Sequence, residues 1–181
     1  MDLIEHLTSE HRDAERLLKQ LKDTEPGSAR DALVDELTTA LQTHMAVEEQ
    51  FLYPIVADTL GQEPEEEAET EHTLAREGLG KLDELRAEPG FGAAVDMVEA
   101  GIAHHVKEEE HEIFPKLRAQ AADEVAQLDP EECEAAVKRG ASGSSTVDLT
   151  KDELYQQAQE ADIPGRSSMT KDELAQALAA R

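Results

Sequence analysis

The sequence predicts an all-α protein: an antiparallel four-helix bundle followed by a short fifth helix, a flexible linker and a small C-terminal helix-loop-helix module. Composition is the first reason, because aromatic residues make up only 3% of the chain and Trp is absent, while Ala, Leu, Glu, Asp and Gln dominate. This composition is typical of helices and not of sheets. The second reason is that four long segments with helical apolar spacing are separated by turn signals.

Each of the four long helices has a local signal at its ends. The first ends before the turn "TEPGS", and the second opens at Ser28, where Asp31 follows three residues later in a capping pattern. Pro54 is expected to bend the last turns of the second helix, because proline cannot donate a backbone hydrogen bond. The acids of "GQEPEEE" favour the start of the third helix, and the turn "EPGFG" precedes the fourth, which has Pro115 near its end. In chain order the helices span about residues 2–23, 28–59, 68–87 and 93–121.

The chain is predicted to have three parts. Residues 1–138 form the bundle, whose short last helix is capped by Asp129 and reaches Lys138. Residues 139–147 contain "RGASGSS" and form a flexible linker. Residues 148–181 repeat a Thr-x-x-Glu capping pattern in "TKDELYQQAQ" and "TKDELAQALA", so they are expected to form two short helices joined by a loop.

Charge and cysteine content exclude several classes of partner and site. The net charge is −25, so a phosphate backbone or an anionic membrane surface would repel the chain as a whole. The N-terminus "MDLIEHLTSEH" has no basic region followed by an apolar run, and no apolar stretch approaches membrane-spanning length. The single cysteine, Cys133, excludes an intramolecular disulfide and a thiolate metal cluster. A cytoplasmic protein without a membrane partner is the simplest interpretation.

The second and fourth helices contain an internal repeat. The stretch "HMAVEEQFLYP" at 44–54 matches "HVKEEEHEIFP" at 105–115, with the polar residues held in register. Aligning the two prolines pairs His44 with His105, Glu48 with Glu109, and Tyr53 with Phe114.

Each of the four helices places one histidine inside its apolar stripe, since residues three and four apart share a helix face. In the second and fourth helices a glutamate follows one turn later. A single histidine on such a stripe is more often a hydrogen-bonded core residue than a ligand. Four histidines and two glutamates that converge in one bundle instead indicate a metal site. The candidate ligands are His11, His44, Glu48, His72, His105 and Glu109.

The choice between two adjacent histidines depends on helical register. His105 is preferred to His104 because it lies in register with Ile102 and Glu109. His104 has the same spacing to Glu108, so this alternative stays open.

Other titratable residues nearby are interpreted as solvated. His6 and His111 fall outside the repeating pattern. Runs of glutamate usually form solvent-facing surfaces, so the same interpretation applies to Glu49, Glu108 and Glu110.

Two glutamates on apolar stripes need a partner of opposite charge. An unpaired buried carboxylate costs several kcal/mol, and the stripes offer no Lys or Arg to neutralise it. A cation would neutralise both glutamates and use the imidazole lone pairs, and this ligand set suits iron, zinc or manganese. The ligands are too many for one tetrahedral zinc but fit two octahedral ions bridged by the glutamates, with a position open to oxygen, peroxide or nitric oxide. The alternatives are an ordinary polar core or a purely structural acidic bundle.

The spacing of these residues resembles that of the hemerythrin-like cation-binding (HHE) domains. The resemblance covers roughly residues 1–120 and includes both His-x-x-x-Glu motifs with their trailing prolines. It implies a four-helix bundle that holds a non-haem di-iron centre bridged by an oxo or hydroxo group. The six candidate ligands would hold the two iron ions, with Glu48 and Glu109 as bridges.

The resemblance has one departure. Oxygen-carrying hemerythrins have a second histidine one turn after the third-helix ligand, and Arg76 stands at that position here. Tyr53 could supply another donor, because its counterpart Phe114 has no hydroxyl; an ordinary interfacial tyrosine is the alternative. The missing histidine disfavours reversible oxygen transport and favours reactivity, for example catalase-like breakdown of H2O2 or reaction with NO.

The C-terminal repeat supports a second functional hypothesis. It resembles the helix-loop-helix at the N-terminus of transcription termination factor Rho, which is similar to SAP motifs and in relatives often contacts nucleic acid. Residues 147–181 hold four Lys or Arg against seven Asp or Glu, a net charge of −3, which disfavours strong non-specific binding of nucleic acid. The alternative to a reactive di-iron protein is therefore an iron, oxygen or redox sensor whose module 148–181 contacts a protein or nucleic acid.

Overall fold

The computed structural model describes residues 1–143, and within that range the chain is helical without β-strands, which confirms the predicted all-α bundle. Two short π-helical turns, η1 and η2, interrupt the long second and fourth predicted helices. The elements are α1 (Leu3–Lys22), α2 (Ser28–Val47), η1 (Glu48–Leu52), α3 (Tyr53–Leu60), α4 (Gln62–Glu84), α5 (Phe91–Glu108), η2 (Glu109–Ile113), α6 (Phe114–Gln120), α7 (Ala122–Val125) and α8 (Pro130–Gly143).

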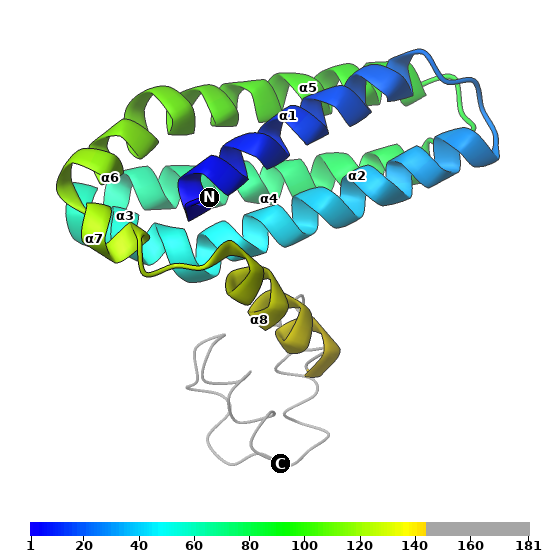
Figure 1. Ribbon diagram of the computed structural model, residues 1–181. Helices are drawn as coiled ribbons and strands as arrows, with labels where there is room; N and C mark the ends of the chain where they lie inside the picture. The colour runs from blue at the N-terminus through cyan, green and yellow to red at the C-terminus, as the bar shows by residue number, and fades with distance from the viewer. Residues whose placement is uncertain (144–181) are drawn as a thin grey trace, which may run out of the picture. The chain divides into compact units, whose positions relative to one another are not determined.

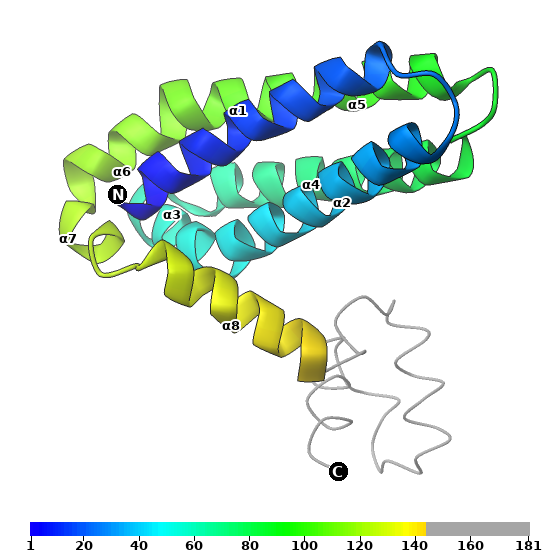
Figure 2. The ribbon, with the colours of Figure 1, turned by 45° about the vertical axis from the view of Figure 1, so that its right-hand side comes forward.

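The four long helices α1, α2, α4 and α5 lie lengthwise beside one another (Figures 1 and 2). Helix α1 contacts α2 and α5, and α4 contacts the same two helices. The chain divides into two compact units, Met1–Glu134 and Ala135–Arg181, and all candidate ligands lie in the first. The predicted module 148–181 lies outside the described residues.

One cluster of apolar core residues lies mainly on one side of the layer formed by the four histidines, and other buried apolar residues, such as Leu7 and Leu52, lie on its other side. On α1 the core residues follow His11, as with Ala14 and Leu18, whereas on α2 they precede His44, as with Leu37. On α4 the residues of this cluster again follow the histidine, as with Leu79, and on α5 most of them precede it, as with Val98. The order alternates because neighbouring helices run in opposite directions. The four histidines therefore form one layer across the bundle, with η1 and η2 beyond it.

The internal repeat reappears as two matching π-helical turns. The amide of Tyr53 donates to the carbonyl of Glu48, five residues back, and the amide of Phe114 donates to that of Glu109 in the same way. A proline follows each donor, and its ring would clash with the carbonyl four residues back in a regular α-helix. The wider turn relieves that clash. The bend expected at Pro54 thus takes the form of a π-helical turn just before it.

The last described helix is longer than predicted. Helix α8 continues past Lys138 to Gly143, into the stretch 139–147 predicted as a linker. Glycine and serine weaken a helix by about 1 kcal/mol each or less, so they do not by themselves end it. The domain boundaries at 138 and 147 stay predictions.

Candidate metal centre

Four buried imidazole rings point their Nε2 atoms at one another in two pairs. His11 Nε2 lies 3.1 Å from His44 Nε2, and His72 Nε2 lies 3.2 Å from His105 Nε2. The four histidine residues are at most 8% exposed. Donor atoms bound at about 2.1 Å and at right angles to one another on a shared ion would lie about 3 Å apart, so each pair has the separation of two ligands on one metal.

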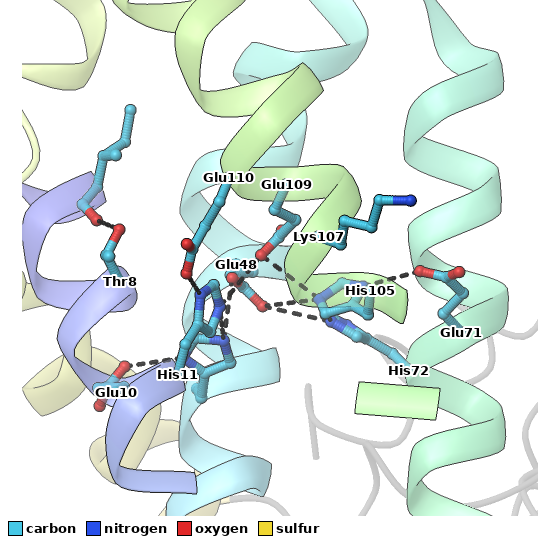
Figure 3. A network of polar contacts seen from close by, with 12 residues as sticks. Thr8, Glu10, His11, Glu48, Glu71, His72, His105, Lys107, Glu109 and Glu110 are labelled. Atoms are coloured by element: carbon cyan, nitrogen blue, oxygen red, sulfur yellow. Dashed lines mark hydrogen bonds and ion pairs between the residues drawn. The ribbon is translucent and has the colours of Figure 1, made fainter. Parts of the chain in front are cut away.

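Glu48 and Glu109 lie between the two imidazole pairs (Figure 3). Glu48 Oε1 is 3.1 Å from His44 Nε2, whereas Glu48 Oε2 is 3.3 Å from His72 Nε2. Glu109 Oε2 lies 3.3 Å from His11 Nε2. The same oxygen of Glu109 lies 3.5 Å from His105 Nε2, in the other pair. Each of the two carboxylates therefore lies near both imidazole pairs, as a bridging ligand must.

Three carboxylate oxygens of the cluster are buried without a hydrogen-bond partner: both of Glu48 and Oε2 of Glu109. Glu48 is 0% exposed and Glu109 is 1% exposed. Leaving a charged oxygen buried without a donor costs at least about 1–3 kcal/mol, and native proteins seldom tolerate it. A bound cation would satisfy these oxygens, so the residues fit a metal and not an ordinary polar core.

The donors fall into two groups that share Glu48. One group is Glu48 with His72 and His105; the other group is His11, His44, Glu48 and Glu109. All members of both groups are buried. Two neighbouring groups with a shared carboxylate are the arrangement that a dinuclear centre requires.

Each imidazole is anchored on its other nitrogen by a carboxylate. The four Nδ1–carboxylate distances are all 2.9 Å: His11 to Glu110, His44 to Glu10, His72 to Glu49 and His105 to Glu71. A carboxylate on Nδ1 holds the proton there, orients the ring and leaves the Nε2 lone pair free for a metal.

These anchoring glutamates correct two predictions. Glu49 and Glu110 were expected to face solvent. This expectation is wrong, because Glu49 is hydrogen-bonded to His72 and Glu110 is hydrogen-bonded to His11. The repeat carried a signal for them, since glutamate follows both Glu48 and Glu109. Solvent exposure of an "EEE" run is an average property, whereas the contact depends on which helix packs beside it.

The other two anchoring residues, Glu10 and Glu71, were not singled out in the sequence. Each directly precedes a candidate ligand, in "EH" at 10–11 and at 71–72. With them the repeat extends across the bundle at a constant offset of 61 positions: 10 and 71, 11 and 72, 44 and 105, 48 and 109, and 49 and 110. The site is therefore built from two equivalent halves.

The structure distinguishes the two adjacent histidines. His105 is buried in the cluster, whereas the side chain of His104 is 59% exposed and lies 3.2 Å from Glu71 outside it. His111 is exposed, as expected, and bonds a carbonyl of its own helix. His6 is half-buried and bonds Glu134 at 2.9 Å, so the prediction of a solvated side chain is wrong for His6.

Tyr53 breaks the equivalence of the halves. Its hydroxyl lies 3.1 Å from His72 Nε2 and donates to Glu109 Oε1 at 3.3 Å. The counterpart Phe114 stacks beside His11 at 6.0 Å and offers no polar atom. The half that contains His72 therefore has an oxygen donor that the other half lacks.

The charges of the cluster shift the pKa values of its members. Burial alone would lower the pKa of His44, but the charge of Glu48 and the bond to Glu10 outweigh it and raise that pKa to about 10. The pKa of His105 is raised to about 9 against the same effect of burial, by Glu109 and Glu71. Burial and both carboxylates raise the pKa of Tyr53 well above its usual value. Because the pKa values of His44 and His105 are raised, protons compete with metal ions for these two imidazoles.

Arg76 does not point its charge into the cluster. Its Nη2 bonds both oxygens of Glu49, at 2.8 and 2.9 Å. Arg12 contacts Glu110 in the other half. Each of these two anchoring glutamates therefore lies between a histidine and an arginine, which balances its charge.

A family model described as the hemerythrin HHE cation binding domain matches residues 2–117. The match contains both π-helical turns and every member of the cluster. No curated protein and no solved structure matches the chain. Among residues 1–143, no helix combines the length and the apolar character needed to cross a membrane.

Proposed function

Because the chain belongs to the family of hemerythrin HHE cation-binding domains, we propose that the cluster holds two iron ions and reacts with a small oxygen species such as O2, H2O2 or NO. The observation that carries this proposal is the set of three buried carboxylate oxygens without a hydrogen-bond partner, surrounded by four imidazole Nε2 atoms. Imidazole and carboxylate ligands suit iron, and no thiolate is present in the cluster.

In this proposal, His11 and His44 would hold one ion, and His72 and His105 the other. Glu48 and Glu109 would be the bridges, which is supported by the membership of Glu48 in both donor groups and by the approach of Glu109 to both His11 and His105. Bound there, two iron ions would supply redox chemistry toward a small oxygen species. The four anchoring carboxylates keep each Nε2 lone pair directed inward.

Breakdown of hydrogen peroxide is the reaction that the chain's own groups favour. Arg76 stands where oxygen-carrying hemerythrins have a further histidine, and it pairs with Glu49. The half with His72 therefore has two imidazoles, one fewer than the resemblance would supply. Tyr53 holds a proton next to this half, at a hydroxyl whose raised pKa keeps it protonated in the metal-free protein. A buried proton donor beside an open ligand position can assist cleavage of an O–O bond.

Metal content and peroxide turnover together test the proposal. We expect about two iron ions per chain, a near-ultraviolet absorption from an oxo-bridged centre, and oxygen release from H2O2 by the iron-loaded protein. His44→Ala should lose both metal and turnover. His111→Ala should change neither, since His111 is exposed and bonds its own helix. Protein that takes up no metal on anaerobic addition of iron would contradict the proposal.

Tyr53→Phe tests whether the phenol oxygen binds metal. The substitution makes this half resemble the half with Phe114, so metal binding should persist. If Tyr53 is a ligand, the loaded wild type shows a visible phenolate-to-iron band that Tyr53→Phe lacks. Identical visible spectra would exclude Tyr53 as a ligand and leave it as a hydrogen-bond donor to Glu109.

A further inference from the structure

A cavity of about 720 Å³ lies beside the histidine layer and is lined by residues of all four long helices. The rings of the four histidines form part of its wall. Peroxide or a diatomic gas needs a space comparable to that of one water molecule, about 30 Å³. Pockets of about 300–1,000 Å³ instead hold organic ligands of drug-like or cofactor size. The cavity is therefore much larger than the small oxygen species require.

The wall of the cavity is mainly apolar away from the histidines. Leu41 and Met45 come from α2, and Val98, Ile102 and Val106 come from α5. These five side chains also belong to the apolar core. A ligand that fills this space would bury apolar surface against them, at about 25 cal/mol per Å².

Exposed apolar side chains mark the mouth of the cavity between α4 and α5. Leu74 is 61% exposed and Met97 is 70% exposed, and both line the cavity. Among the described residues, Met1 is the other large hydrophobic residue exposed to this extent. Exposed apolar residues at the rim of an apolar pocket are typical of ligand-binding grooves.

Two glycines line the cavity near this mouth, Gly78 on α4 and Gly101 on α5. A Cβ added at Gly101 would meet no atom within 4 Å, whereas a Cβ at Gly78 would lie 2.8 Å from Val98 Cγ2. Glycine at 78 therefore allows α4 and α5 to approach closely, and glycine at 101 leaves space beside Met97.

The charges along the wall restrict the ligand. Acidic residues outnumber basic ones, since Lys81 is accompanied by Glu10, Asp13, Glu71 and Glu77. The net charge of the chain is −25. An anionic ligand such as a fatty-acid carboxylate would be repelled.

We propose that this cavity binds an uncharged, mainly apolar organic molecule, which enters between Leu74 and Met97 and contacts the imidazole rings. The proposal goes beyond the reaction with small oxygen species, because binding in the cavity does not depend on metal. It assigns the bundle a second ligand, adjacent to the site of the first.

Titration with the neutral fluorescent probe N-phenyl-1-naphthylamine tests this proposal on the full chain, with and without iron. We expect saturable binding of one probe per chain, and displacement by dodecanol. Gly101→Phe should weaken binding at least tenfold, because the ring would occupy the mouth. Gly92→Phe is the matched control: it also lies on α5 with no atom within 4 Å of an added Cβ, but it does not line the cavity.

The outcomes separate this proposal from the proposed function. Equal binding by Gly101→Phe and wild type, or absence of saturable binding, overturns the cavity proposal even if iron binds and peroxide is consumed. Displacement by dodecanoate as effective as that by dodecanol overturns the preference for an uncharged ligand. Met97→Glu gives a second check that does not threaten folding, since Met97 is 70% exposed, and it should also weaken probe binding.

Discussion

Each ligand imidazole of the cluster is held between a carboxylate on Nδ1 and the proposed metal position on Nε2. The anchoring bonds are of equal length in the four cases, 2.9 Å, although they join different pairs of elements. An imidazole held in this way has a defined tautomer and orientation, so little rearrangement is needed when a metal binds. The anchoring glutamates should therefore matter for affinity although they do not touch the metal.

Glu49→Gln tests this role. Loss of the charge that faces His72 Nδ1 should weaken metal binding about 10–100-fold, the usual effect of removing such a partner. It also leaves Arg76 without its carboxylate partner. Competition with a chelator of known affinity measures the change.

Glu112→Gln is the matched control for Glu49→Gln, because Glu112 is an exposed glutamate of the other π-helical turn. Its metal affinity should equal that of the wild type. Equal affinities for Glu49→Gln and Glu112→Gln would show that anchoring at Nδ1 contributes nothing.

At the scale of elements, the π-helical turns decide which side chains reach the cluster. In a regular α-helix, residues five apart point in clearly different directions. The turn from Glu48 to Tyr53 is closed by a bond over five residues, which brings both side chains to the same face. Tyr53 is consequently 1% exposed and contacts the cluster.

Pro54→Ala tests the cause of the first π-helical turn. Alanine can donate an amide hydrogen to the carbonyl of Gln50 and does not clash with it, so the turn is expected to relax toward α-helix. Tyr53 should then rotate away from Glu109 and become more accessible. Acrylamide quenching of tyrosine fluorescence measures this in a Tyr155→Phe background, where Tyr53 is the remaining tyrosine.

Pro26→Ala serves as the control for Pro54→Ala, since Pro26 is exposed in the turn between α1 and α2. Quenching should rise with Pro54→Ala and stay at the wild-type value with Pro26→Ala. Unchanged quenching in both variants would mean that packing of α3, and not the proline, maintains the π-helical turn.

For the whole molecule, the cluster links stability to pH. In the metal-free protein the pKa of His44 is about 10 and that of His105 about 9, against 6.5 for an ordinary histidine. Raised pKa values stabilise the fold fully below about pH 6.5, and this contribution is lost as the pH rises toward 10. The pKa of Glu48 is lowered, against the effect of burial, mainly by the charge of His44, so its contribution is lost as the pH falls below its usual value of 4.5.

The melting temperature of the metal-free protein should therefore fall between about pH 6.5 and pH 9.5. The double variant His44→Gln/His105→Gln retains the surface charges of the wild type, so it serves as the control, and its melting temperature should depend less on pH. If the melting temperatures of the two proteins changed with pH in the same way, these two histidines would not be the cause of the pH dependence of stability. With metal bound, the imidazoles are deprotonated, so binding should release protons and strengthen as the pH rises.

The helices and the six candidate ligands could be predicted from the amino-acid sequence, and the structure brings these six residues into one buried cluster. Both follow from local spacing, because residues three and four apart share a helix face whatever packs against it. The role of those residues as iron ligands stays a prediction.

The partners of these residues could not be predicted from the sequence and became known from the packing of the helices. This packing placed His105 and not His104 in the cluster, assigned Glu110 to His11 across 99 positions, and paired Arg76 with Glu49. Such contacts join different helices, so they depend on how each helix is rotated and positioned against its neighbours. Helical periodicity describes one helix at a time and leaves that relation undetermined.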